Sequence, residues 1–185
     1  VEFKDNSNIS TGFIDTYVKL MHDFDPTHVI GVYLPAGSEY NYKRWYARLQ
    51  ASPRRSLNGY LVYSNGGFYS GTGEMVEANV TYRYQPYINL TLNTVFSNLR
   101  LPAPFGYRQF WLIGPKIDIT FSPKVYLTTF VQYNEQLNNT NVNIRFQWRY
   151  KPVSDLFIVY TDNYFANTRE VRNRALVLKL SYWLN

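Results

Sequence analysis

The stretch that decides the fold runs from residue 141 to residue 150 and reads NVNIRFQWRY. Every second residue in it is apolar, and every residue between is polar. Because successive side chains of a β-strand point to opposite faces of the sheet, this alternation predicts a strand with one apolar face and one polar face. Such a strand separates two very different environments.

The same alternation recurs along most of the chain, which makes the predicted fold class all-β. It is clearest in residues 76–85, 88–97 and 113–121, and further strands are expected at 124–134, 156–161 and 174–184.

Turn residues give a second regularity. Short connections that contain proline are expected at Pro26, Pro53, Pro86, Pro123 and Pro152. Longer polar connections are expected between them, at residues 35–40, 65–73, 98–107, 135–140 and 163–172. Tight turns at one end and longer loops at the other are typical of outer-membrane barrels. The sequence therefore predicts an antiparallel, up-and-down transmembrane β-barrel with its prolines on the periplasmic side.

Composition is consistent with a barrel wall. The mean hydropathy is −0.34, and no stretch is long and apolar enough to predict a membrane-spanning helix. Transmembrane strands alternate apolar and polar residues, so they do not raise the mean hydropathy. Aromatic residues make up 18% of the chain against 17% charged residues, and Tyr and Trp suit the boundary between lipid and water.

Charge and reactive residues argue against several function classes. The net charge of +6 is spread singly along the strands, so we expect no nucleic-acid partner. The chain has no cysteine and only His22 and His28, so no metal, no cofactor and no enzymatic activity are predicted. The glycine-rich residues 66–73 lack the lysine of a phosphate-binding loop and predict a hairpin loop.

The alternation assigns side chains to two faces. Lipid-facing positions are predicted at Val142, Ile144, Phe146, Trp148, Leu176, Leu178 and Leu180. Lumen-facing positions are predicted at Arg44, Arg48, Arg83, Lys116, Asp118, Arg145, Arg149 and Lys179. Because basic residues predominate in the second set, an open lumen is expected to favour anions.

A family resemblance rests on residues 34–37, 52–55, 66–71, 121–123, 130–134, 145–160 and 174–180. These segments resemble the C-terminal β-barrel of a large envelope protein family of Bacteroidota. The family carries a periplasmic carbohydrate-binding family-nine-like module before a barrel domain of unknown function. The likeness covers about residues 29–184, implies a bacterial outer-membrane barrel and implies no activity. This chain lacks the module and ends Trp183-Leu184-Asn185 instead of on a terminal aromatic residue.

Counting back from the C-terminus predicts about ten strands, the first near residue 28, and residues 11–23 supply an eleventh. Residues 1–10 are then an external loop or linker, and Val1 lies on the external side. Single-chain bacterial barrels have even strand numbers. Either residues 1–23 are therefore not a membrane strand and a small ten-stranded barrel closes, or further strands precede Val1. We expect the second, with residues 1–185 as the C-terminal part of a larger barrel.

The predicted function is that of an outer-membrane pore, a scaffold or an anchor, with membrane lipid and other envelope proteins as partners. Two alternatives from other classes remain: a soluble carbohydrate-binding β-sandwich and a barrel-embedded hydrolase. A soluble sandwich would need no detergent for extraction. The hydrolase would need a catalytic serine or carboxylate in an occluded pocket.

Overall fold

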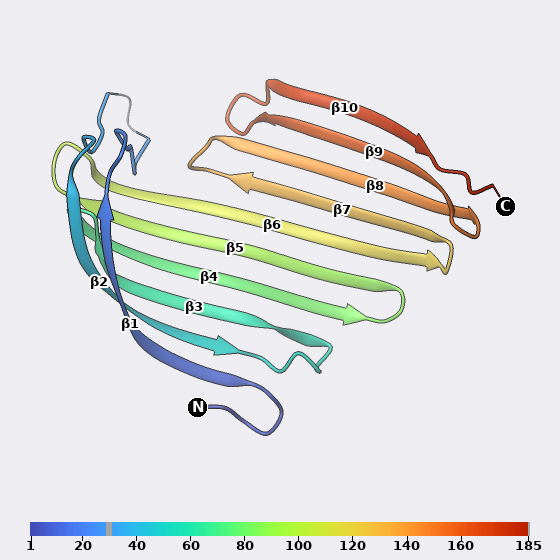
Figure 1. The fold of residues 1–185 in the computed structure, drawn as a ribbon, viewed down its shortest axis with the longest axis horizontal. Helices are drawn as coiled ribbons and strands as arrows, with labels where there is room; N and C mark the ends of the chain where they lie inside the picture. Colours follow the sequence, from blue (N-terminus) through green and yellow to red (C-terminus); the bar gives the residue numbers. More distant parts are fainter. Residues whose placement is uncertain (29–30, 185) are drawn as a thin grey trace. The chain divides into compact units, whose positions relative to one another are not determined.

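The computed structural model describes residues 1–28 and 31–184. These residues form ten β-strands and no helix (Figure 1). The strands are β1 (Asn8–Lys19), β2 (Glu39–Gln50), β3 (Leu57–Phe68), β4 (Gly71–Tyr84), β5 (Ile88–Leu101), β6 (Gly106–Ser122), β7 (Val125–Asn134), β8 (Asn139–Lys151), β9 (Ser154–Phe165) and β10 (Val171–Leu180).

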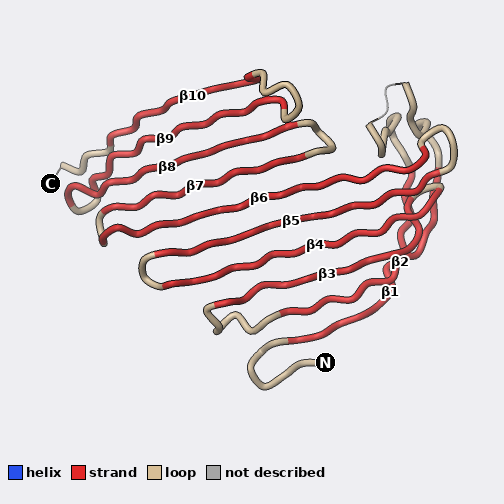
Figure 2. Tube along the Cα trace, turned by 180° about the vertical axis from the view of Figure 1, so that it is seen from behind, coloured by secondary structure: helices blue, strands red, loops and turns tan. Residues whose placement is uncertain are grey.

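All ten strands belong to one antiparallel sheet in which each strand pairs with its neighbours in sequence, in the order β1 to β10 (Figure 2). The predicted all-β, up-and-down antiparallel topology is therefore confirmed. Within the described residues β1 pairs only with β2 and β10 only with β9, so the sheet is open and not a closed barrel. Strand lengths of 10 to 17 residues exceed the usual five or six.

The chain divides into two compact units. The first unit contains Val1–Asn79 and Thr94–Trp111, and the second contains Val80–Asn93 and Leu112–Asn185. Each unit is described below by itself.

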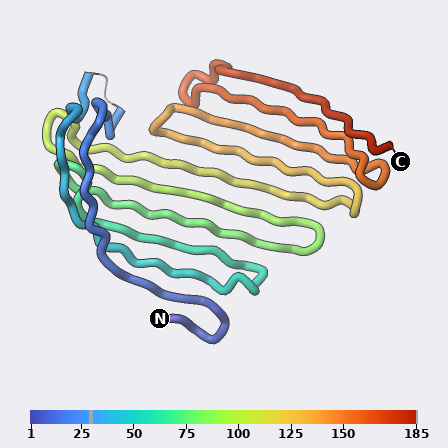
Figure 3. Tube along the Cα trace, in the orientation of Figure 1, coloured from blue at the N-terminus to red at the C-terminus, as the bar shows by residue number. Residues whose placement is uncertain are grey.

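The N-terminal part differs from the prediction. Residues 8–19 form β1, whereas the described residues between 20 and 38 form a loop in place of a strand near residue 28 (Figure 3). Residues 29 and 30 of that predicted strand lie outside the described residues. The loop is held by a bridge between Phe24 and Leu34 and by the Asp23 carboxylate, which accepts a hydrogen bond from the Ala36 amide at 2.8 Å.

Local chemistry explains this loop. Asp25 accepts a hydrogen bond from the Thr27 amide at 2.8 Å, an Asx-turn that competes with strand pairing, and Gly37 has a φ of 83°. Pro26 therefore lies in the longest connection, at the opposite end of the strands from the other four prolines. In the described residues no strand forms near residue 28, and β1 is the first of ten strands, the lower of the two predicted numbers. The external position of Val1 stays a prediction.

The connection predicted at residues 65–73 is also shorter than expected. The hairpin is confirmed, but β3 continues to Phe68 and β4 starts at Gly71, which leaves a two-residue turn. The glycines serve close packing of the strands: a Cβ at Gly66 would meet the backbone of Lys43 and Arg44, and its φ is 154°. Tight turns therefore occur at both ends of the strands, and the predicted strict alternation of short and long connections is wrong.

Residues 1–7 fold back along the start of β1. The Ile9 amide donates to the Val1 carbonyl at 2.9 Å, and the Phe3 amide donates to the Ser7 carbonyl at 2.8 Å. Asp5 pairs with Arg55 at 2.7 Å, and the Ser52 hydroxyl donates to the Asp5 carbonyl. The segment thereby packs against the connection between β2 and β3.

Candidate functional site

The strand register shows which residues of the second unit share a face, because directly opposed residues of an antiparallel pair point the same way. Asp118 is opposite Thr128, Thr128 is opposite Arg145, and Arg145 is opposite Val159. Lys116 lies two residues before Asp118 on β6 and therefore points to the same face. We call this the polar face of the second unit, and it contains the predicted lumen positions Lys116, Asp118, Arg145, Arg149 and Lys179.

Side chains of the polar face form a hydrogen-bonded network. Lys116 Nζ lies 2.9 Å from Asp118 Oδ2, and the Thr128 hydroxyl donates to Asp118 Oδ1 at 2.9 Å. Gln147 Nε2 donates to Asp155 Oδ1 at 3.0 Å, and Arg149 Nε lies 3.4 Å from the same oxygen. Both carboxylates are therefore paired with cations.

Two shallow hollows lie on this polar face. One is lined by residues that include Asp118, Thr128 and Arg145. The other is lined by residues that include Arg83, Asn89 and Asp118, which places the predicted lumen residue Arg83 beside the network. Five basic side chains therefore gather on one face of the second unit, together with two carboxylates.

The opposite face of the second unit is apolar. Ile144 is opposite Tyr160, which is opposite Leu176, and Phe146 is opposite Ile158, which is opposite Leu178. The side chains of β10 on this face are far from buried, with 71% of Leu176 and 69% of Leu178 exposed. All seven predicted lipid-facing residues share this face; that it meets lipid stays a prediction.

The apolar face ends in a polar group that the sequence analysis missed. Arg174 Nη2 lies 2.7 Å from Asp162 Oδ2, and the Tyr160 hydroxyl donates to the same carboxylate at 2.9 Å. The available signal was the position of Arg174, two residues before Leu176 and therefore on the same side of the strand.

The first unit repeats the division into two faces. Arg44 and Arg48 lie on one side of β2, where Arg48 lies 4.3 Å from the ring centroid of Tyr60. The Tyr60 hydroxyl donates to Glu77 Oε1 at 2.6 Å. Trp45 and Leu49 lie on the other side, opposite Phe13 and Ile9 of β1, respectively.

We call the side of β2 that carries Arg44 and Arg48 the polar face of the first unit. An aromatic cluster lies on this face at the end next to the 20–38 loop, which we call the loop end. Tyr40 and Tyr42 share the side of β2 that carries Arg44, and Tyr69 lies 5.3 Å from Tyr40 and 5.9 Å from Tyr42. Phe24 of the 20–38 loop lies 5.2 Å from Tyr69. The loop therefore covers the loop end of this face. Burial, together with Tyr42 and Tyr40, raises the pKa of Tyr69.

This cluster adjoins the buried hydrophobic core of the first unit. The core residues belong to the loop, to β5 and to the connection after β5, and sequence alternation alone did not predict them. They are Leu20, Leu34, Leu99, Leu101 and Phe105.

Neither a metal-binding cluster nor a membrane-spanning helix is found among the described residues. Among residues 1–28 and 31–184 no three His, Asp or Glu side chains gather in a way that could hold a metal ion. The same part of the chain contains no helix of the length and apolar character needed to cross a membrane.

Comparison with known proteins does not identify a relative. No family model matches the chain, and neither a curated protein nor a solved structure matches it. The resemblance to the Bacteroidota barrel family therefore stays a prediction.

Proposed function

We propose that this chain is part of the wall of a β-barrel in the bacterial outer membrane, with its apolar face toward lipid and its basic polar face toward the interior. The observation that carries this proposal is the pair of opposite faces in the second unit. One face exposes most of Leu176 and Leu178, and the other carries Lys116, Arg145 and their partners.

The extent of the apolar face supports a lipid partner. On β7 it runs from Val125 to Tyr133, which is about 27 Å along a strand. At the tilt of about 40° that is usual in barrels, this length covers about 20 Å of membrane thickness, close to the roughly 25 Å apolar band of outer-membrane proteins. A soluble sandwich would instead cover such a face with a second sheet.

The open edges of the sheet support a larger barrel. Unpaired backbone N–H and C=O groups cost several kcal/mol each in lipid, so transmembrane sheets are closed. We therefore propose that β1 and β10 pair with further polypeptide in the membrane. In this proposal the chain has no catalytic role.

The interior role that the geometry supports best is an anion-favouring passage. Arg83, Arg145 and Lys179 lie on a face whose two carboxylates, Asp118 and Asp155, are paired with Lys116 and Arg149. A surface with this charge balance attracts anions. A specific observation favours the anchor alternative: the 20–38 loop covers the loop end of the polar face in the first unit.

Tryptophan quenching tests the membrane assignment. We expect acyl-chain-brominated phosphatidylcholine to quench the fluorescence of the full chain reconstituted in vesicles. Trp148→Phe should reduce the quenched fraction more than Trp183→Phe, because Trp148 lies on the apolar face and Trp183 lies beyond β10. Release of the protein from vesicles by alkaline carbonate would contradict the proposal.

Planar-bilayer recording of the complete protein tests the interior. Anion-selective conductance supports a passage, and Arg145→Glu should reduce the selectivity, whereas Arg174→Glu on the apolar face is the control. Absence of conductance supports the anchor role. Cation selectivity would contradict the basic interior.

A further inference from the structure

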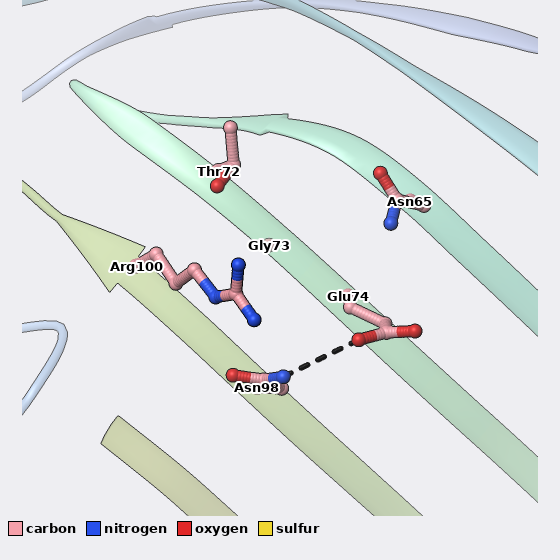
Figure 4. A pocket seen from close by; sticks show the side chains of 6 residues that line it. All are labelled: Asn65, Thr72, Gly73, Glu74, Asn98 and Arg100. Atoms are coloured by element: carbon pink, nitrogen blue, oxygen red, sulfur yellow. Dashed lines mark hydrogen bonds between the residues drawn. The ribbon is translucent and has the colours of Figure 1, made fainter. Parts of the chain in front are cut away.

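A polar hollow lies in the first unit among β3, β4 and β5. Its lining residues are Asn65, Thr72, Gly73, Glu74, Asn98 and Arg100 (Figure 4). None of them belongs to the sets of predicted lipid-facing or lumen-facing residues.

The register places this hollow on the side of the first unit that carries Trp45 and Leu49, away from Arg44 and Arg48. We call this side the apolar face of the first unit. Asn65 is opposite Trp45, and Tyr63 is opposite Ala47 on the same side of the sheet. The Tyr63 hydroxyl donates to Glu74 Oε1 at 2.8 Å, which brings the carboxylate to that side as well. The hollow is therefore open to the medium that the apolar face meets.

The hollow lies where this face changes from apolar to charged. Along β2, Leu49 is followed on the same side by Ala47, Trp45 and Lys43, and Lys43 lies 3.5 Å from Asp15. Two aromatic pairs lie at this level: Trp45 is 6.0 Å from Tyr63, and Phe96 is 4.6 Å from Trp111. Trp and Tyr gather at the headgroup level of membranes, so the hollow lies at headgroup depth.

Two polar groups of the hollow, an acceptor on Asn98 and the cation of Arg100, have no matching partner among the described residues. Asn98 is only 9% exposed, its Nδ2 donates to Glu74 Oε2 at 3.3 Å, and its Oδ1 has no hydrogen-bond partner among the described residues. The Arg100 guanidinium lies 5.8 Å from the Tyr107 ring centroid, and in the described part of the chain it has no carboxylate partner. A fitting ligand offers an anionic acceptor to Arg100 and a hydroxyl donor to Asn98.

We infer that this hollow binds the headgroup of an anionic membrane lipid that carries hydroxyls beside its phosphate, and phosphatidylglycerol serves as the simplest probe for it. The hollow measures about 200 Å³, against about 30 Å³ for one water molecule, so it holds a small headgroup and not a large glycan. The apolar residues Leu49 and Leu61 extend from this level along the sheet, where acyl chains would lie. The inference rests on the proposed function, because lipid reaches the hollow only if the apolar face is embedded.

Lipid selectivity of the full chain tests this inference. Vesicles of phosphatidylcholine receive an equal small fraction of brominated phosphatidylglycerol or brominated phosphatidylcholine, and quenching of Trp45 and Trp111 reports the lipid near the hollow. We expect an about tenfold preference for phosphatidylglycerol, the factor that one charge-assisted hydrogen bond supplies. Arg100→Gln and Asn98→Asp should each abolish most of the preference, with unchanged β-sheet circular dichroism.

The control is Lys43→Gln, which removes a cation from the same face outside the hollow and should keep the preference. An unchanged preference in Arg100→Gln would overturn the inference. Loss of the preference on addition of soluble glycerol phosphate would also overturn it, because the hollow would then take a free solute. If brominated phosphatidylcholine quenches but no preference exists, only this inference fails. If neither lipid quenches, the proposed function fails, and this inference fails with it.

Discussion

Single residues of β8 show how strongly adjacent positions differ. Asn143 and Ile144 are neighbours in sequence, yet Asn143 Nδ2 donates to the Thr161 hydroxyl at 3.0 Å on the polar face, while Ile144 is opposite Tyr160 on the apolar face. A substitution at one position therefore tests one face only.

Ile144→Arg should destabilise the membrane-inserted protein by about 2 to 4 kcal/mol, because a charged side chain would enter the apolar band. Asn143→Arg should be nearly neutral, since the polar face already holds cations. Urea unfolding in lipid vesicles measures both free energies. Equal effects at the two positions would refute the assignment of faces.

Asp5 makes the N-terminal segment sensitive to acid. Hydrogen bonds from the Ser7 side chain and amide, with a further contribution from Arg55, lower the pKa of Asp5 against the opposing effect of burial. A carboxylate with a depressed pKa stabilises the folded segment above its unfolded pKa, and this stabilisation is lost as the pH falls through the folded pKa.

We therefore expect amide exchange in residues 3–9 to accelerate once the pH drops below the ordinary range of aspartate. Asp5→Asn should show faster exchange at neutral pH and no such acid transition. Hydrogen exchange followed by mass spectrometry measures both variants. An acid transition of the same size in Asp5→Asn would show that another group is responsible.

At the scale of elements, the alternation of apolar and polar residues predicted the strands that have one apolar face and one polar face. Residues 141–150 of β8 form a strand in which apolar and polar side chains alternate without exception. The alternation is weaker in β9, where Phe157 and Val159 lie on the polar face. Alternation could not predict the 20–38 loop, because Asp25 and Gly37 act through local turn geometry. It also missed the hollow, since Glu74 and Arg100 line one hollow only after the strands β4 and β5 have formed.

Glycine positions within hairpins provide an element-level prediction. A Cβ at Gly71 would meet the backbone of Arg100 and Leu101, whereas at Gly114 the nearest atom would be Phe130 Cε2 at 3.5 Å, an ordinary contact. Gly71→Ala should therefore destabilise the protein by about 1 to 3 kcal/mol, the usual cost of overpacking. Gly114→Ala should be close to neutral. Chemical unfolding of both variants measures the difference, and equal stabilities would contradict the close approach of the backbones.

At the scale of the whole molecule, the proposed membrane location requires a further pairing partner for the open edges of the sheet. The strand β10 pairs with β9 from Val171 to Leu180, and its other edge has no strand partner among the described residues. In lipid, that edge would leave a row of backbone donors and acceptors without partners, at a cost of several kcal/mol for each group. In water it would remain a template for aggregation.

Hydrogen exchange along β10 therefore decides whether the edge is paired in the membrane. In an antiparallel strand, alternate amides point toward opposite neighbours, so one set of β10 amides is directed to β9 and the other set away from it. If the barrel is closed by further polypeptide, both sets should exchange slowly in the complete protein in vesicles, and single-cysteine variants at β10 should crosslink to the partner strand. The chain contains no native cysteine, so each such crosslink would report one engineered position. Fast exchange of the outward set after insertion into vesicles would contradict a closed barrel, because water would then reach an edge that lipid cannot solvate.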